Sequence, residues 1–156
     1  MFIIVVCIFK FDSTNHSLGR KANFLKKEER IKYYNSLFLK IDEHINKAKS
    51  INDNSIEGKL IHYSKIFDNL LNIIYDYYLI ENYKIDYDNS NVSNSNIINY
   101  LKDRHILKER LIDDLHYARK KFNLIKHDLD CEGIDEEIVI SITNKLYNIT
   151  KRIVYK

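Results

Sequence analysis

The chain has 156 residues, of which 45% are hydrophobic and 30% charged, and its formal net charge is only +3. This length fits one ordinary domain, and the hydrophobic fraction suffices for a core. The small charge excludes the profile of a chromatin-type binder, and three glycines without any proline argue against a turn-rich all-β fold. We therefore expect an all-α protein.

The first eleven residues, MFIIVVCIFKF, are almost entirely apolar. A membrane span takes about 20 apolar residues, and a secretory signal has a charged start and a small-residue cleavage site, which are missing here. Val5 and Val6 favour a short strand or an apolar arm. Such an arm either caps the core or exchanges with a partner, and we favour the cap.

Helical periodicity dominates the rest of the chain. Apolar residues recur three and four positions apart over roughly 22–49, 55–82 and 106–128, and again after Asp135, with a short helix at 96–103. The expected buried faces include Ile31, Ile56 and Ile138. The pattern predicts a single helical domain over 1–156, a bundle of about five helices with two long antiparallel helices and a shorter pair behind them.

Several residues predict where helices begin and end. Asn54, with Glu57 three positions later, resembles an N-cap, and Asp135 is placed to cap the last helix. Gly133 is free to take a positive φ before it. Arg104 and His105 are adjacent and do not share a helix face, so they indicate a solvated helix junction.

The cysteines and two of the histidines indicate no metal site. Cys7 and Cys131 are far apart and form no C-x-x-C pattern, so a reducing cytoplasm is the expected compartment. His44 and His62 each stand alone in a helical stretch, without a second ligand one turn away. We expect no cofactor.

The stretch HYARKKFNLIKHD, residues 116–128, crowds polar residues around an apolar spine. At about 100° per residue, Arg119, Asn123 and His127 stack in one ridge beside the core face. Cations are favoured near a helix C-terminus in any case, so the ridge fits both a solvated helix end and a phosphate site. Further positive charge comes from Lys120, Lys121 and Lys126.

This stretch resembles the signature of HEPN domains, a helical-bundle family of prokaryotic toxins, CRISPR-associated nucleases and defence proteins. The signature is an Arg and a His separated by four to six residues near the end of a long helix, often with a polar residue directly after the Arg. Asn123 and His127 match its second half, and the resemblance covers roughly residues 55–155. Phe122, however, stands where the family has Arg, and seven residues separate Arg119 from His127.

The resemblance implies metal-independent ribonuclease chemistry in which the RNA 2′-OH attacks the adjacent phosphate. His127 would act as general acid or base, Asn123 as the orienting group, and Arg119 or Lys121 as the phosphate ligand. Lys120, Lys121 and Lys126 would contact RNA, and Tyr117 and Tyr147 are candidates to stack on bases. Family members usually pair two such motifs across a dimer.

Either Arg119 reaches the site from one turn earlier and the chain is an active ribonuclease, or the domain has lost its full catalytic set. Because Phe122 cannot stabilise phosphoryl charge, we favour the degenerate set. The leading hypothesis is a HEPN-like protein of a defence or toxin–antitoxin system that contacts RNA, as a homodimer or a heterodimer with another helical protein. The alternatives are a non-enzymatic helical interaction protein, such as an antitoxin or mobile-element inhibitor, and an accessory domain that only dimerises. A His127 bonded to Asp128 or Asp130 favours these alternatives.

Overall fold

The computed structural model describes residues 27–51, 55–81, 92–128 and 131–156, and this part of the chain forms five α-helices and no strand. The expected all-α bundle is confirmed. The expected apolar arm at the N-terminus and the Asn54 cap lie outside the described residues. The helices are α3 (Lys27–Ser50), α4 (Ile56–Glu81), α5 (Asn94–Asp103), α6 (Glu109–Asp128) and α7 (Glu136–Val154).

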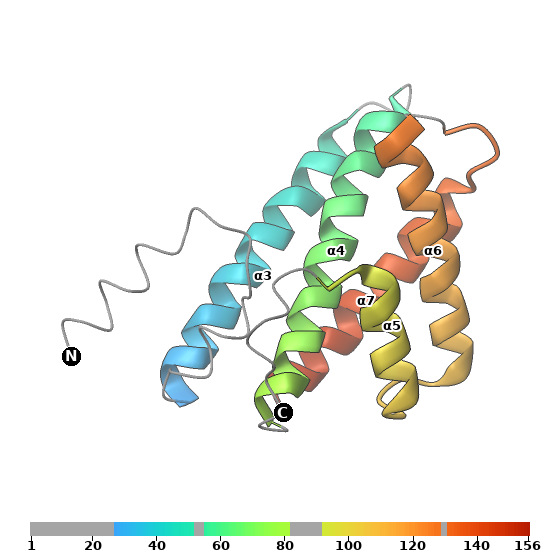
Figure 1. The fold of residues 1–156 in the computed structure, drawn as a ribbon. Helices are drawn as coiled ribbons and strands as arrows, with labels where there is room; N and C mark the ends of the chain where they lie inside the picture. The colour runs from blue at the N-terminus through green and yellow to red at the C-terminus, as the bar shows by residue number, and fades with distance from the viewer. Residues whose placement is uncertain (1–26, 52–54, 82–91, 129–130) are drawn as a thin grey trace.

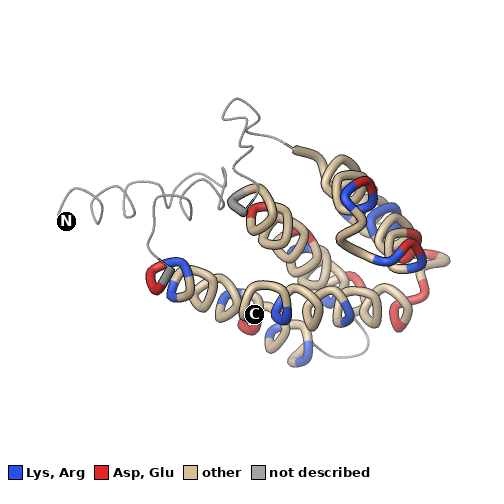
Figure 2. The backbone as a smooth tube through the Cα atoms, turned by 90° about the horizontal axis from the view of Figure 1, so that it is seen from below, with Lys and Arg blue, Asp and Glu red and all other residues tan. Residues whose placement is uncertain are grey.

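The helix α4 lies at the centre of the bundle and contacts α3, α5, α6 and α7 (Figure 1). The long helices α3 and α4 run antiparallel, while α5 and α6 form a hairpin on the other side of α4 and α7 passes behind it (Figure 1). None of the described helices is long and apolar enough to cross a membrane. Acidic and basic positions are interspersed along the helices rather than separated into two poles (Figure 2).

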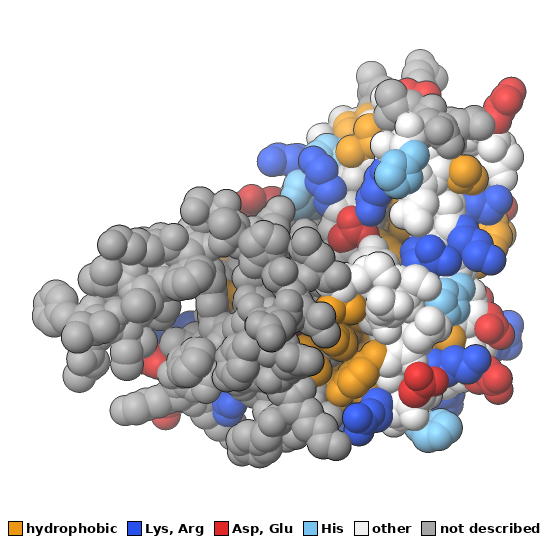
Figure 3. Space-filling model, in the orientation of Figure 1, with side chains coloured by type: hydrophobic (Ala, Val, Ile, Leu, Met, Phe, Trp, Pro, Cys, Tyr) orange, Lys and Arg blue, Asp and Glu red, His pale blue; other side chains and the backbone are white. Residues whose placement is uncertain are grey.

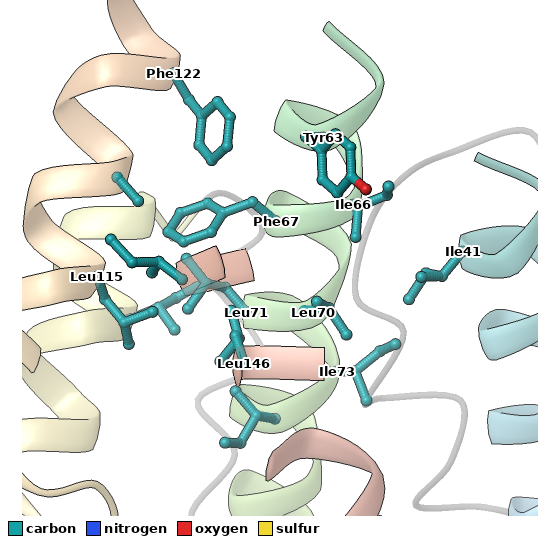
Figure 4. Packing of buried hydrophobic residues seen from close by; sticks show 14 of the residues in the cluster. Ile41, Tyr63, Ile66, Phe67, Leu70, Leu71, Ile73, Leu115, Phe122 and Leu146 are labelled. Atoms are coloured by element: carbon teal, nitrogen blue, oxygen red, sulfur yellow. The ribbon is translucent and has the colours of Figure 1, made fainter. Parts of the chain in front are cut away.

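The core is built around the apolar side of α4. Phe67 of α4 and Phe122 of α6 point toward each other, with ring centroids 5.2 Å apart (Figure 4). Ile41 reaches α4 from α3, and Leu146 reaches it from α7 (Figure 4). The α4 side chains with no exposed surface are Leu60, Phe67, Leu70, Leu71 and Ile74.

Three residues expected in the core are exposed. Ile31, Ile56 and Ile138 keep 39%, 43% and 46% of their surface accessible. Each lies in the first two turns of its helix, where neighbouring helices cover only part of the surface, and Val139, directly after Ile138, is fully buried. Periodicity identifies the apolar side of a helix but does not show how far along the axis its neighbours extend.

The ends of the helices follow the local signals. The side chain of Asp135 accepts a hydrogen bond from the Ile138 N–H at 3.2 Å, which makes it the N-cap of α7, and Gly133 before it has φ 72°. The helix α6 begins at Glu109 rather than near 106. His105, with φ 54°, separates α5 from α6, and it is exposed with Arg104 as expected for a solvated junction.

Candidate functional site

The predicted ridge of α6 lies on one flank of the helix, beside its buried face. Arg119 and Asn123 are half-buried at the edge of the core, and His127 is exposed in the last turn. The apolar face that holds the helix in place consists of Leu115, Ala118, Phe122 and Ile125. The sequence therefore positions the ridge by burying the residues next to it.

Arg119 lies near His116, on the side of α6 that contacts α5. His116 donates from Nε2 to Oδ1 of Asn99 on α5, at 3.2 Å. Burial lowers the pKa of His116, and the positive charges of Arg119, Lys120 and Lys102 lower it further, while Asp113 opposes them. Three cations thus lie close enough to the His116 imidazole, at the α5–α6 contact, to lower its pKa.

The guanidinium of Arg119 forms no ion pair with a carboxylate of the described residues. Its Nε atom is buried and has no hydrogen-bond partner. Helical side chains lean toward the N-terminus, which is the direction of His116 and away from His127. Because Arg119 and His127 are also about 12 Å apart along the axis, they do not converge on one phosphate within a single chain.

The last turn of α6 is tied to α4. Lys126 Nζ lies 2.5 Å from Oδ2 of Asp68, and Oδ1 of the same carboxylate accepts a hydrogen bond from Asn94 Nδ2 at 2.6 Å. The charge of Lys126 is therefore partly neutralised. His127 makes no hydrogen bond or ion pair with any side chain that the structure describes beside it.

Two of the proposed RNA contacts lie away from this flank. Lys121 is about 200° around the helix from Arg119, and its ammonium group lies 5.4 Å from the ring centroid of Tyr117. Tyr147 belongs to the α3–α7 contact, where its hydroxyl donates to Asp42 at 2.7 Å. Lys120, in contrast, is exposed on the flank that carries the ridge.

The position that holds Arg in HEPN domains is part of the core here. Phe122 is 1% exposed and packs against Phe67. A charged side chain at this point would be buried between α4 and α6. The presence of Phe in place of the Arg of the HEPN signature therefore affects the core packing of the bundle, and not only its surface.

The structure also brings together two histidines that lie far apart in the sequence. The Nδ1 atoms of His44 on α3 and His62 on α4 are 3.1 Å apart. Each histidine stands alone within its own helix, as expected, and its partner comes from the neighbouring helix. Because α3 and α4 run antiparallel, residues about equally far from the segment that joins them lie side by side, and this rule would have paired His44 with His62.

The described residues contain no group of three or more His, Cys, Asp or Glu side chains that could hold a metal ion. No protein-family model, curated protein or solved structure matches the chain. The HEPN resemblance consequently depends on the α6 motif and the order of the helices alone.

Proposed function

We propose that this chain is a HEPN-like helical protein of a defence or toxin–antitoxin system that contacts RNA through the flank of α6 without cleaving it. The observation that supports this most is the group of cations around His116. Lys102 and Lys120 are exposed there, and Arg119 has no carboxylate partner among the described residues. Lys and Arg side chains grouped in this way donate hydrogen bonds to phosphate oxygens and neutralise their charge.

The small net charge and the small number of cations on this flank limit the expected affinity for RNA. Lys102, Arg119 and Lys120 provide up to three phosphate contacts. For single-stranded nucleic acid, the slope of log affinity against log salt is about −0.7 per contact. We therefore expect modest, salt-sensitive affinity with little sequence preference.

The geometry of the ridge within one chain supports the proposal that RNA is not cleaved. Metal-independent cleavage needs an acid–base group and a cation at the same phosphate. Phe122 is buried, and Arg119 leans away from His127, so one chain provides no Arg beside that histidine. His127 and Asn123 are left as polar contacts without the electrostatic half of the mechanism.

The test of RNA contact uses two lysine pairs of equal charge. Lys102→Ala with Lys120→Ala removes two exposed cations beside His116, whereas Lys108→Ala with Lys145→Ala removes two exposed cations elsewhere. In fluorescence anisotropy with a single-stranded RNA, the first pair should weaken binding and reduce the salt slope by about 1.4. Equal effects of both pairs would show that overall charge, and not this flank, attracts the RNA.

A cleavage assay in EDTA completes the test. We expect no 2′,3′-cyclic phosphate product from wild-type protein, and an identical result from His127→Ala. Since a general acid or base contributes about 10²- to 10⁴-fold to a rate, genuine activity would be plain on a gel. Cleavage by the wild type that His127→Ala removes would contradict the degenerate site.

A second candidate function is that of a non-enzymatic interaction protein, such as an antitoxin or inhibitor. The outer side of α6 favours it, because Tyr117 and Leu124 are 37% and 42% exposed there. The two positions are about 20° apart around the helix after two turns. A partner protein that co-purifies from the host with the wild type and with Lys102→Ala, Lys120→Ala, but not with Leu124→Lys, would favour this function over RNA contact.

A further inference from the structure

The clearest polar cluster outside α6 lies between α3 and α4. His44 and His62 face each other, with ring centroids 5.4 Å apart and Nδ1 atoms 3.1 Å apart, so one Nδ1–H donates to the other ring. Lys47 follows His44 by about one turn, and Lys65 follows His62 in the same way. Within the described residues, neither Nε2 atom has a hydrogen-bond partner.

The charges around the pair select an anion and not a metal ion. Imidazoles often bind metals, but the described chain brings no third ligand to this pair. Burial is the main cause of the lowered pKa of both rings, and the positive charges of Lys47 and Lys65 add to it. Glu43 acts in the opposite direction on His44, and its effect there is the smallest.

The cluster and the end of α6 lie on the same face of the molecule. Lys65 is exposed on α4, with His62 and Asp68 about 60° to either side of it around the helix. His62 contacts α3, while Asp68 contacts Lys126 of α6. Side chains of Lys, Arg and His gather over the upper parts of α3, α4 and α6 on this face (Figure 3).

We propose that His44, Lys47, His62 and Lys65 form a phosphate-binding site that extends the RNA contact of α6 across α4 and binds RNA more tightly at acidic pH. The inference rests on the proposed function, because RNA is taken as the source of the phosphate. Helices in contact are spaced by about 8–10 Å, so a short single strand spans from α3 to α6.

The pH dependence follows from the charges that face the pair. The first proton taken up is shared between two rings already in hydrogen-bond contact. The second places two imidazolium groups together, beside Lys47 on α3 and Lys65 on α4, with only Glu43 near to oppose them among the described side chains. A phosphodiester relieves this repulsion, so it favours the protonated rings, and by linkage a fall in pH favours the phosphodiester.

The test measures binding of oligouridylate, whose bases and phosphodiesters do not titrate in this range, at about pH 7.5 and about pH 5.5. For the wild type we expect several-fold tighter binding at the lower pH and a salt slope steeper by about 0.7 per added phosphate contact. His44→Gln with His62→Gln should remove most of this gain, whereas His105→Asn, at an exposed histidine with φ 54°, should retain it. An equal gain in the His44, His62 variant would overturn the proposal.

Imidazole NMR resonances distinguish the source of the phosphate. Oligouridylate should shift the His44 and His62 resonances and raise the pKa of both rings, and unchanged thermal unfolding of the Gln variant shows that its fold is intact. Shifts with inorganic phosphate but not with the RNA would assign a free phosphate ligand and overturn the extension of the RNA contact.

The same titrations separate this inference from the proposed function. A pH-dependent gain that persists while Lys102→Ala, Lys120→Ala has no effect would reject the α6 contact and retain the histidine site. Loss of affinity in the lysine variant, together with an absent pH-dependent gain in the wild type, would retain the α6 contact and reject the histidine site.

Discussion

Phe122 packs against Phe67 between α6 and α4, with 1% of its surface exposed. Replacement by Ala leaves a cavity and is expected to lower the free energy of unfolding by about 3–5 kcal/mol. Phe122→Arg, which introduces the arginine of the HEPN signature, should be at least as damaging because it buries an unpaired charge. Urea unfolding measures both, with Tyr117→Ala as the control for an exposed aromatic residue of the same helix. A well-folded Phe122→Arg variant would contradict this expectation, because it would show that α6 can rotate about its axis and bring position 122 to the surface.

At the scale of single residues, the sequence predicts what local chemistry determines. Asp135 and Gly133 could be assigned because a cap and a positive φ depend on neighbours within a few positions. The direction of Arg119 toward His116 also follows from helical geometry, but its unpaired state depends on which carboxylates other helices bring near. The contact of His44 with His62 joins separate helices, so no local pattern contains it.

At the scale of helices, Asp68 of α4 connects three elements. Its carboxylate binds Lys126 of α6 and Asn94 at the start of α5, and both partners of the ion pair are about one-third exposed. An ion pair of this exposure contributes about 0–1 kcal/mol. Its larger effect is electrostatic, since it neutralises Lys126 and places a negative charge on the face proposed to contact RNA.

Asp68→Asn is therefore expected to strengthen RNA binding, in contrast to most substitutions in a binding face. Release of Lys126 adds one phosphate contact, which should steepen the salt slope by about 0.7. Anisotropy titrations at several salt concentrations measure the change, and Asp103→Asn, an exposed acid at the end of α5, is the charge-matched control. If both substitutions have the same effect, Lys126 is not part of the contact.

At the scale of the whole molecule, the bundle follows from the periodicity of its helices, and the sequence predicted this much. The helices bury their apolar sides around α4, since α4 is apolar over most of its circumference. Periodicity does not predict which helices pack against each other. That α7 packs on α4, and that the α5–α6 hairpin brings Lys102 to His116, depend on the fit of whole surfaces, which periodicity does not encode.

The outer side of α6 provides the prediction for assembly. Tyr117 and Leu124 are exposed there, and His127 is exposed in the turn that follows. We expect a homodimer in which two α6 helices meet near a two-fold axis, so the dimer buries two copies of Leu124, one from each chain. Full burial of a Leu side chain contributes about 1.5–3 kcal/mol, and the 42% of Leu124 that is exposed accounts for less than half of this in each chain. With two copies per dimer, Leu124→Lys should thus weaken dimerisation by about 10-fold or more. Analytical ultracentrifugation measures this, with Leu39→Lys, at a residue of α3 that is 64% exposed, as the matched control. A wild-type chain that sediments as a monomer at concentrations of tens of micromolar, where specific interfaces usually persist, would rule out the dimer.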